Sequence, residues 1–300
     1  MSIRYRQLST FLEVARLGAV GKAADALNLS QPAVTRTIRE LEQAAGMPLF
    51  AREGRGIRLT PAGEEFRRHA AASVAALRTG FEALRGLESS AAPRLRIGAL
   101  PTVSARIMPK VMATLLATTQ ARVKIVTGEN AVLLDQLARA ELDVVVGRLA
   151  APERMVGLTF EHLYSEQVRF VVRAGHPLAT REPFRPEEIA SYPVVMPTPS
   201  AIIRPFVERL LISQGLPDLP VRIESVSDSF GRAFLRGSDA VWIISEGVVA
   251  DELASGAFVA LPLDTAETRG GVGITLRAEQ DRTPQLDGFI RALRQVAAGQ

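Results

Sequence analysis

Residues 22–41 contain two helical patterns joined by a tight turn, and this pairing constrains the fold more than any other feature of the chain. The first pattern contains small alanines that let a neighbouring helix approach closely, and the segment 28–30 has the composition of a turn. Ser30 is a favoured N-cap, and Pro32 is tolerated in the first turn of the helix that follows. These residues therefore predict a helix-turn-helix arrangement.

The second of these helices is expected to have a polar, basic face opposite its buried side. Val34, Ile38 and Leu41 recur at helical spacing, which predicts that they are buried. The opposite face holds side chains that hydrogen-bond to base edges and phosphates: Gln31, Thr35, Arg36 and Arg39. An ordinary three-helix packing unit is the alternative interpretation.

The segment 49–60 favours the nucleic-acid interpretation. It predicts a two-stranded hairpin with a glycine turn and with arginines at every third position, namely Arg52, Arg55 and Arg58. A basic hairpin beside a helix-turn-helix is a wing that can hold phosphates. The charge distribution agrees, because residues 1–62 hold nine Arg and Lys against five acids, whereas the rest of the chain holds 27 of each sign.

Residues 61–88 predict one long helix. Thr60 and Pro61 can begin it, and the segment 89–93 breaks it. Its apolar positions alternate steps of four and three residues, as in a coiled coil: Ala70, Val74, Leu77, Phe81 and Leu84. We expect Val74, Leu77, Phe81 and Leu84 to form a dimerisation seam, and a helix packed within its own chain is the alternative.

From Arg94 onward the hydrophobic period changes to alternating strands and helices. Strands are expected at 95–100, 123–126, 142–146, 168–172, 194–196, 221–223, 241–244 and 273–276. Helices are expected at about 102–118, 131–140, 201–213, 227–235 and 284–297. This order implies parallel sheets in two α/β lobes, with a ligand between the lobes beyond the carboxyl ends of the strands.

Polar residues at the predicted strand ends and helix starts are candidates for binding a small acidic effector. Helix N-termini favour carboxylates, and arginines add ion pairs. The candidates are Thr102, Ser104, Thr127, Asn130, Arg148, Thr198, Ser200 and Arg204. In the alternative interpretation, Thr102, Asn130 and Ser200 only cap their own helices.

The composition excludes several kinds of chemistry. The 300 residues include no cysteine, and the three histidines (His69, His162 and His176) are too scattered to predict a metal site or a catalytic triad. The glycines at 270–273 lack the spacing and the following helix of a dinucleotide-binding motif. We therefore expect no enzymatic activity and no cofactor.

The sequence also lacks signals for export or membrane insertion. No apolar run reaches the about 18 residues of a membrane span, and the N-terminus has no apolar signal region. We expect a cytoplasmic protein without membrane contact. A periplasmic solute-binding protein, which the C-terminal half alone would suit, does not fit this expectation.

The N-terminal motif resembles the LysR-type transcriptional regulators. The matching residues are Ala23, Ala24, Leu27, Ser30–Val34, Ile38, Leu41, Glu42, Gly46, Leu49, Phe50, Arg52, Leu59, Thr60, Ala62 and Gly63. The resemblance implies that Gln31, Pro32, Thr35 and Arg36 enter the major groove, with Arg39 on the same face, and that Arg52 and Arg55 hold phosphates. Gly21 departs from the family, which usually has a capping serine or threonine nearby, so a weaker cap is expected.

The resemblance also implies the architecture, which is α plus α/β. It comprises a winged helix-turn-helix domain at 1–62, a linker helix at 63–90 and an effector-binding domain at 91–300 that resembles type 2 periplasmic binding proteins. Lobe 1 is expected at about 91–164 and 268–300, and lobe 2 at about 165–267. The implied partners are double-stranded operator DNA, RNA polymerase and further copies of the chain in a dimer or tetramer.

Within the family, the C-terminal half is similar to activators of the protocatechuate branch of the β-ketoadipate pathway. The stretches that show this are Ile97–Pro109, Val126–Leu134, Phe160–Ser165 and Val226–Phe234. The similarity implies activation of aromatic-acid catabolism in response to protocatechuate or a carboxymuconate. A LysR-type regulator of another pathway, with another small carboxylate effector, is the alternative.

Overall fold

The computed structural model describes residues 3–54, 56–88, 94–216, 219 and 221–299. These residues form two compact units. The first unit extends through the long helix α4, and the second contains nearly all of the chain from Arg94 onward. Within the described residues, no helix has both the length and the apolar composition that a membrane span requires.

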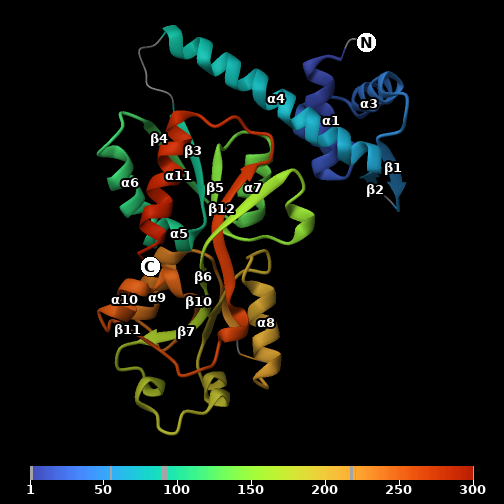
Figure 1. The fold of residues 1–300 in the computed structure, drawn as a ribbon. Coiled ribbons are helices and arrows are strands. Elements are labelled where there is room, and N and C mark those ends of the chain that lie inside the picture. The colour runs from blue at the N-terminus through green and yellow to red at the C-terminus, as the bar shows by residue number, and fades with distance from the viewer. Residues whose placement is uncertain (1–2, 55, 89–93, 217–218, 220, 300) are drawn as a thin grey trace. The chain divides into compact units, whose positions relative to one another are not determined.

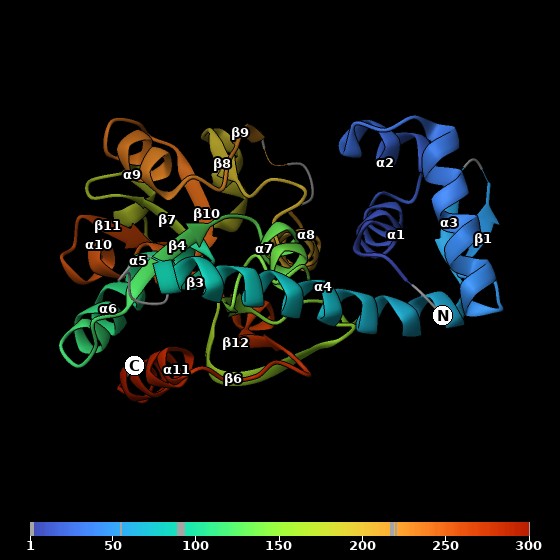
Figure 2. The same ribbon diagram turned by 90° about the horizontal axis from the view of Figure 1, so that it is seen from above.

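The first unit is a three-helix head with a hairpin and one long helix (Figure 1). Its elements are α1 (Tyr5–Leu17), α2 (Val20–Leu27), α3 (Gln31–Ala45), β1 (Phe50–Glu53), β2 (Gly56–Leu59) and α4 (Pro61–Glu88). Strands β1 and β2 pair in antiparallel fashion, with Phe50 opposite Leu59. The predicted winged helix-turn-helix fold is confirmed, and Figure 2 shows α4 as one continuous helix.

The helix starts follow the capping residues. The Ser30 side chain accepts a hydrogen bond from the N–H of Ala33 at 3.4 Å, as the N-cap assignment predicts. Helix α2 instead has Ala19 as its N-cap and no side-chain cap, in agreement with the weaker cap expected from Gly21. Asn28 forms the turn with a φ of 53°, in the left-handed region that asparagine tolerates.

The predicted seam on α4 is shorter than the sequence pattern indicates. Ala70 is only 2% exposed and packs in the core of the head, together with residues such as Phe11 and Val14. Ala70 belongs to the apolar pattern of α4 but not to the predicted seam, and its burial shows that the first turns of α4 close the head. Leu77, Phe81 and Leu84 are exposed, at 47%, 64% and 58%.

The second unit contains two lobes, each built on a five-stranded sheet (Figure 1). The first lobe has the strand order β4-β3-β5-β12-β6, and the second has β11-β7-β10-β8-β9. The first-lobe strands are β3 (Arg94–Ala99), β4 (Arg122–Thr127), β5 (Val144–Arg148), β6 (Leu158–Glu166) and β12 (Gly270–Arg277). The second-lobe strands are β7 (Val168–Arg173), β8 (Val194–Met196), β9 (Val221–Glu224), β10 (Val241–Ser245) and β11 (Phe258–Ala260).

Helices cover both faces of these sheets. They are α5 (Pro101–Arg106), α6 (Met108–Leu116), α7 (Asn130–Ala138), α8 (Arg204–Ser213), α9 (Asp228–Arg236), α10 (Ala250–Ala254) and α11 (Pro284–Ala297). Five short 3-10 turns, η1 to η5, complete the order at Pro152–Arg154, Pro177–Thr180, Pro186–Ser191, Glu246–Val248 and Ala266–Thr268. The helix expected at 102–118 is two helices, because Pro109 lacks the N–H that would continue the first and instead lies in the first turn of α6.

The prediction of parallel sheets is wrong in part, because both sheets are mixed. Strand β3 pairs in parallel with β4 and β5, but β12 pairs antiparallel with both β5 and β6. In the second lobe, β7 pairs antiparallel with β10 and β11, whereas β8 pairs in parallel with β9 and β10. The antiparallel strands β6 and β12 are those through which the chain leaves the first lobe and returns to it (Figure 1).

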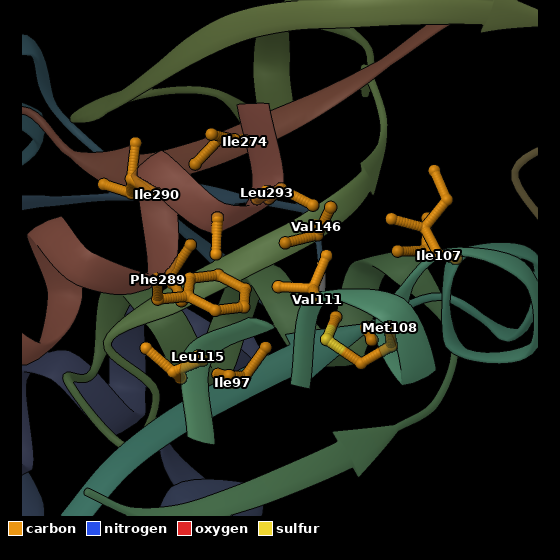
Figure 3. Close-up of a cluster of buried hydrophobic side chains, with 14 of the residues drawn as sticks. Ile97, Ile107, Met108, Val111, Leu115, Val146, Ile274, Phe289, Ile290 and Leu293 are labelled. Carbon is orange, nitrogen blue, oxygen red and sulfur yellow. The ribbon is translucent and has the colours of Figure 1, made fainter. Parts of the chain in front are cut away.

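The core of the first lobe holds its strands in place. Helices α6 and α11 pack on β3, β5 and β12 through side chains that Figure 3 shows pointing toward one another, among them Met108, Val111, Ile274, Phe289 and Leu293. All five are at most 2% exposed, and burial of each such side chain contributes about 1.5–3 kcal/mol. This packing fixes the strand ends that support the site described below.

Candidate DNA-binding face and effector cavity

The exposed side of α3 is a shallow hollow lined by the residues predicted to contact DNA. Gln31, Pro32, Thr35, Arg36 and Arg39 all line it, beside Glu40 and Gln43. The Arg36 side chain is 83% exposed, and its Nε lies 2.9 Å from Oε1 of Glu40. The five predicted residues therefore form one accessible polar surface, and their contact with DNA stays a prediction.

Hydrogen bonds fix the wing to the rest of the head. The Glu42 carboxylate accepts the backbone N–H groups of Leu49 and Phe50 at 2.8 and 3.1 Å. The N–H of Ile57 donates to the Gly18 carbonyl at 3.0 Å. Arg52 is exposed on β1, whereas Arg55 lies outside the described residues.

A cavity of about 60 Å³ lies between the two lobes of the second unit. The first lobe contributes the segments that follow β3 and β4 and the last residue of β5, and the second lobe contributes those that follow β8 and β10. The site therefore lies at the carboxyl ends of strands, as expected for α/β sheets. Most of its wall is apolar, with a few buried polar groups.

Arg148 is the buried cation of this cavity, with a residue exposure of 4%. Its Nη2 donates to the Thr268 carbonyl, and its guanidinium carbon lies 4.8 Å from the centre of the Phe206 ring. Its Nε and Nη1 are buried and have no hydrogen-bond partner among the described residues. Burial lowers the pKa of Arg148, and the charge of Glu166 opposes that shift.

Glu166 is the buried acid of the same cavity, with an exposure of 6%. Its Oε2 also has no hydrogen-bond partner within the described part of the chain. Burial raises the pKa of Glu166 to about 6, while the charges of Arg148 and Arg106 and polar contacts from Thr102 and Gly247 partly offset the increase. Two groups of opposite charge therefore line one cavity with unused hydrogen-bonding capacity.

The glycines at 270–273 allow this arrangement. A Cβ atom at Gly270 would lie 2.3 Å from Nε and Nη2 of Arg148, so the guanidinium occupies the space of a missing side chain. A Cβ at Gly273 would lie 1.9 Å from the Glu161 carbonyl, at an irregularity in the pairing of β12 with β6. The glycine cluster is thus a site of close approach within a strand.

The structure brings some of the predicted effector residues together at the cavity. Thr102 and Asn130 are buried and line it with Arg148. Thr198 and Ser200 lie beside it, and their hydroxyls point to Oε1 of Glu129, at 3.4 and 2.8 Å. Their contact with an effector stays a prediction.

Five predicted residues are absent from the described cavity wall, namely Thr198 and Ser200 beside it and, in addition, Ser104, Thr127 and Arg204. The Ser104 and Thr127 hydroxyls lie 3.3 Å apart, outside that wall. Arg204 pairs with Glu208 at 2.7 Å and with Glu224 at 2.6 Å. These two carboxylates form ion pairs with the Arg204 guanidinium, which was predicted to bind a ligand.

Sequence reasoning did not identify Glu166, Glu129 or Ser245, all of which line the cavity. Glu166 ends β6, a strand that was not predicted because its alternation of apolar and polar residues is weak. The sequence does contain one signal for Glu166, because this acidic residue lies just before the apolar strand β7, at the point where the chain passes from the first lobe to the second.

Both units match family models. A family described as bacterial regulatory helix-turn-helix protein, lysR family, matches residues 5–64, and the LysR substrate binding domain matches residues 88–298. The chain belongs to the LysR family of transcriptional regulators. Its helix-turn-helix head makes this LysR regulator a DNA-binding protein, and its second unit corresponds to the substrate-binding domain of the family.

This LysR regulator is similar to regulators along its whole length. It is 55% identical to the HTH-type transcriptional regulator PcaQ of Agrobacterium fabrum strain C58, over 98% of this chain and 95% of that protein. It is 35% identical to the uncharacterized HTH-type transcriptional regulator YdcI of Escherichia coli K12, over 97% and 95%. Both relatives are described as transcriptional regulators, not as enzymes.

Solved structures share the fold of this LysR regulator. Full-length LysG of Corynebacterium glutamicum, with bound effector arginine, is 20% identical and has a TM-score of 0.61, with 99% of both chains covered. Full-length CbnR in complex with its target DNA is 19% identical, with a TM-score of 0.54 over 98% of this chain and all of that chain. The predicted fold class, a helix-turn-helix domain followed by a two-lobed effector domain, is confirmed.

Proposed function

We propose that this protein activates genes for the catabolism of aromatic acids through the protocatechuate pathway, in response to protocatechuate or a carboxymuconate. The observation that supports this most directly is the buried guanidinium of Arg148, whose Nε and Nη1 have no hydrogen-bond partner among the described residues, in an otherwise largely apolar cavity. Such a group binds a carboxylate through charge-assisted hydrogen bonds. The 55% identity with PcaQ supports the choice of pathway.

The proposed division of the chain follows the sequence analysis. Residues 1–62 bind DNA, with Gln31, Pro32, Thr35, Arg36 and Arg39 in the major groove and Arg52 and Arg55 on phosphates. Residues 63–90 link and dimerise the chain, and residues 91–300 bind the effector. The protein acts in the cytoplasm on operator DNA together with RNA polymerase, as a dimer that assembles into a tetramer.

The effector acts by shifting a conformational equilibrium. Its cavity lies between two lobes, so a bound ligand contacts both and favours the arrangement in which more of its groups are paired. That preference changes how the linker helices space the DNA-binding heads. The ligand shifts the equilibrium only as far as its affinities for the two arrangements differ.

Titration calorimetry on the full-length protein tests the proposal. Protocatechuate or carboxymuconate is expected to bind, and Arg148→Gln to lower that affinity at least tenfold. Arg173→Gln is a matched control, because Arg173 pairs with Asp239 and does not line the described cavity. DNA footprints on the adjacent promoter should change when the effector is added. If neither ligand binds, or if the footprints remain identical, the proposed function is wrong.

A further inference from the structure

We propose that Glu166 receives the effector as a neutral carboxylic acid, so that an effector carboxylate at Arg148 binds together with one proton. The inference rests on the proposed function, because it concerns the same cavity. Glu166 would thus act together with Arg148 in binding the effector, although the sequence pattern did not identify Glu166.

The geometry places the acid and the arginine on either side of one strand. Arg148 ends β5 and Glu166 ends β6, and β12 lies between these strands. In the pairing of β12 with β6, Gly270 is opposite Glu166. The same glycine leaves the space that the Arg148 guanidinium fills. The Arg148 guanidinium therefore extends from β5 to Gly270 of β12, and Gly270 in turn pairs with Glu166 of β6.

The groups around Glu166 come from several elements. Arg148 on β5 and Arg106 on α5 are the cations, and the Tyr164 hydroxyl is on its own strand. The Thr102 hydroxyl on α5 and the Gly247 N–H on η4 are the neutral donors. Without a ligand, Glu166 is the one carboxylate among these groups, and its burial already favours the neutral form. Glu129 lines the same cavity, but its carboxylate accepts a hydrogen bond from Ser200 and is not among the groups that shift the pKa of Glu166.

A bound effector adds a second carboxylate to this set. Two carboxylates brought together in a buried site raise the pKa of one of them, so that it takes up a proton, and the cations Arg148 and Arg106 oppose this rise only in part. Glu166 starts with a pKa raised to about 6, so it is the group that becomes protonated. Its new O–H then donates a hydrogen bond to a ligand oxygen, and no repulsion remains between the two acids.

This model predicts that proton uptake accompanies binding. One proton passes from the solvent to Glu166 for each effector bound, so affinity falls by up to about tenfold for each unit of pH above the pKa of free Glu166. Calorimetry of the full-length protein with protocatechuate and with carboxymuconate at pH 7.5, in two buffers of different ionisation enthalpy, measures the uptake. We expect a value near one.

Glu166→Gln tests the residue itself, because glutamine has the shape of the neutral acid. This variant should bind the same ligand at pH 7.5 at least as tightly as the wild type, with neither proton uptake nor pH dependence. Glu161→Gln is the matched control on the same strand. Its carboxylate pairs with Arg294 at 2.6 Å and does not line the described cavity, so proton uptake should persist.

The outcomes separate this inference from the proposed function. Tight wild-type binding without proton uptake overturns the inference and leaves the proposed function intact, and this measurement requires no variant. A tenfold loss of affinity in Glu166→Gln also overturns it, because Glu166 would then act as an ionised acceptor. If neither ligand binds to the wild type, the proposed function fails, and the inference fails with it.

Discussion

The carboxylate of Glu129 in the first lobe accepts a 2.8 Å hydrogen bond from the hydroxyl of Ser200 in the second lobe. Thr198 donates to the same oxygen at 3.4 Å. Glu129 also lines the cavity, so its charge faces the space in which an acidic effector is proposed to bind. The two lobes are therefore joined by a polar contact that uses the same hydroxyls an effector carboxylate would use.

Removal of this negative charge should strengthen effector binding. Glu129→Gln keeps an acceptor oxygen for Ser200 but removes a charge near an anionic ligand, which is worth about 1 kcal/mol, or roughly fivefold in affinity, at a partly solvated site. Calorimetry measures the change. Ser200→Ala is the control, because it removes the hydrogen bond and keeps the charge. Equal effects of the two variants would contradict the electrostatic explanation.

A methyl group at position 270 should displace the arginine of the cavity. In Gly270→Ala the new Cβ would overlap the Arg148 guanidinium, so effector affinity should fall about tenfold or more. Gly237→Ala provides a matched control, because no atom lies within 4 Å of its added Cβ and its φ of −108° is allowed for alanine. Effector titration of both variants checks this prediction. Unchanged affinity in Gly270→Ala would show that Arg148 does not hold the ligand.

The buried acid should make the free protein less stable as the pH rises. The pKa of Glu166 is about 6 in the folded protein and about 4.5 in the unfolded chain, so the folded state binds its proton more tightly. The tighter proton binding stabilises the folded state fully below pH 4.5, and this stabilisation is lost as the pH rises through 6. The free energy of unfolding therefore falls by about 2 kcal/mol over this range. Glu166→Gln lacks this cost and should be more stable than the wild type by about that amount at pH 7.

Urea unfolding of the ligand-free protein at several pH values measures this difference. The gap between Glu166→Gln and the wild type should narrow between pH 6 and pH 4.5 and be smallest at the acidic end. A gap that stays constant across this range would mean that the glutamine acts through packing and not through charge.

The ion pair between Arg36 and Glu40 on α3 should limit DNA affinity. The Glu40 carboxylate lies 2.9 Å from Arg36 on an exposed face, so it competes with DNA for that arginine. Glu40→Gln should tighten operator binding about two- to fivefold at low salt, since exposed pairs are worth at most about 1 kcal/mol. Arg36→Ala should abolish operator binding without a change in melting temperature. Fluorescence anisotropy measures both, and unchanged affinity in Arg36→Ala would reject a role for this residue.

The exposed apolar positions of α4 should support self-association. Leu77 is 47% exposed, and Leu77→Glu should yield a monomer that binds half-sites weakly. Ile212 on α8 is 70% exposed and is the matched control, because Ile212→Glu adds the same charge at a position outside the seam. Light scattering with size-exclusion chromatography determines the mass of each variant. A dimer that survives Leu77→Glu would argue against this seam.

The head was predictable because local rules determine it. Its caps, its turn and its buried helical stripe are fixed by neighbours in the sequence, so Ser30 and Asn28 behave as their residue types predict. Ala70 shows where such local rules stop, because it continues the apolar pattern of α4 but packs in the core of the head. A period of alternating three- and four-residue steps identifies an apolar stripe but does not indicate whether another part of the same chain already covers it.

The cavity was only partly predictable because it depends on strand direction. Arg148 follows a strongly apolar strand, so the end of β5 could be located from the sequence. Glu166 depends on β6, which is partly exposed along its length and pairs antiparallel with a strand more than 100 residues later in the chain. The pairing of Arg204 with Glu224 could not be predicted either, because Arg204 begins α8 and Glu224 lies at the end of strand β9.

The bonds from Glu42 to the backbone of Leu49 and Phe50 have a consequence for operator architecture. They join the base of the wing to α3, so the helix proposed to enter the major groove and the hairpin proposed to hold phosphates move as one rigid body. The length of DNA that one head contacts would then be the same with and without the effector. Any effector-driven change must appear as a change in the spacing between half-sites, with the sequence preference inside each half-site unaltered.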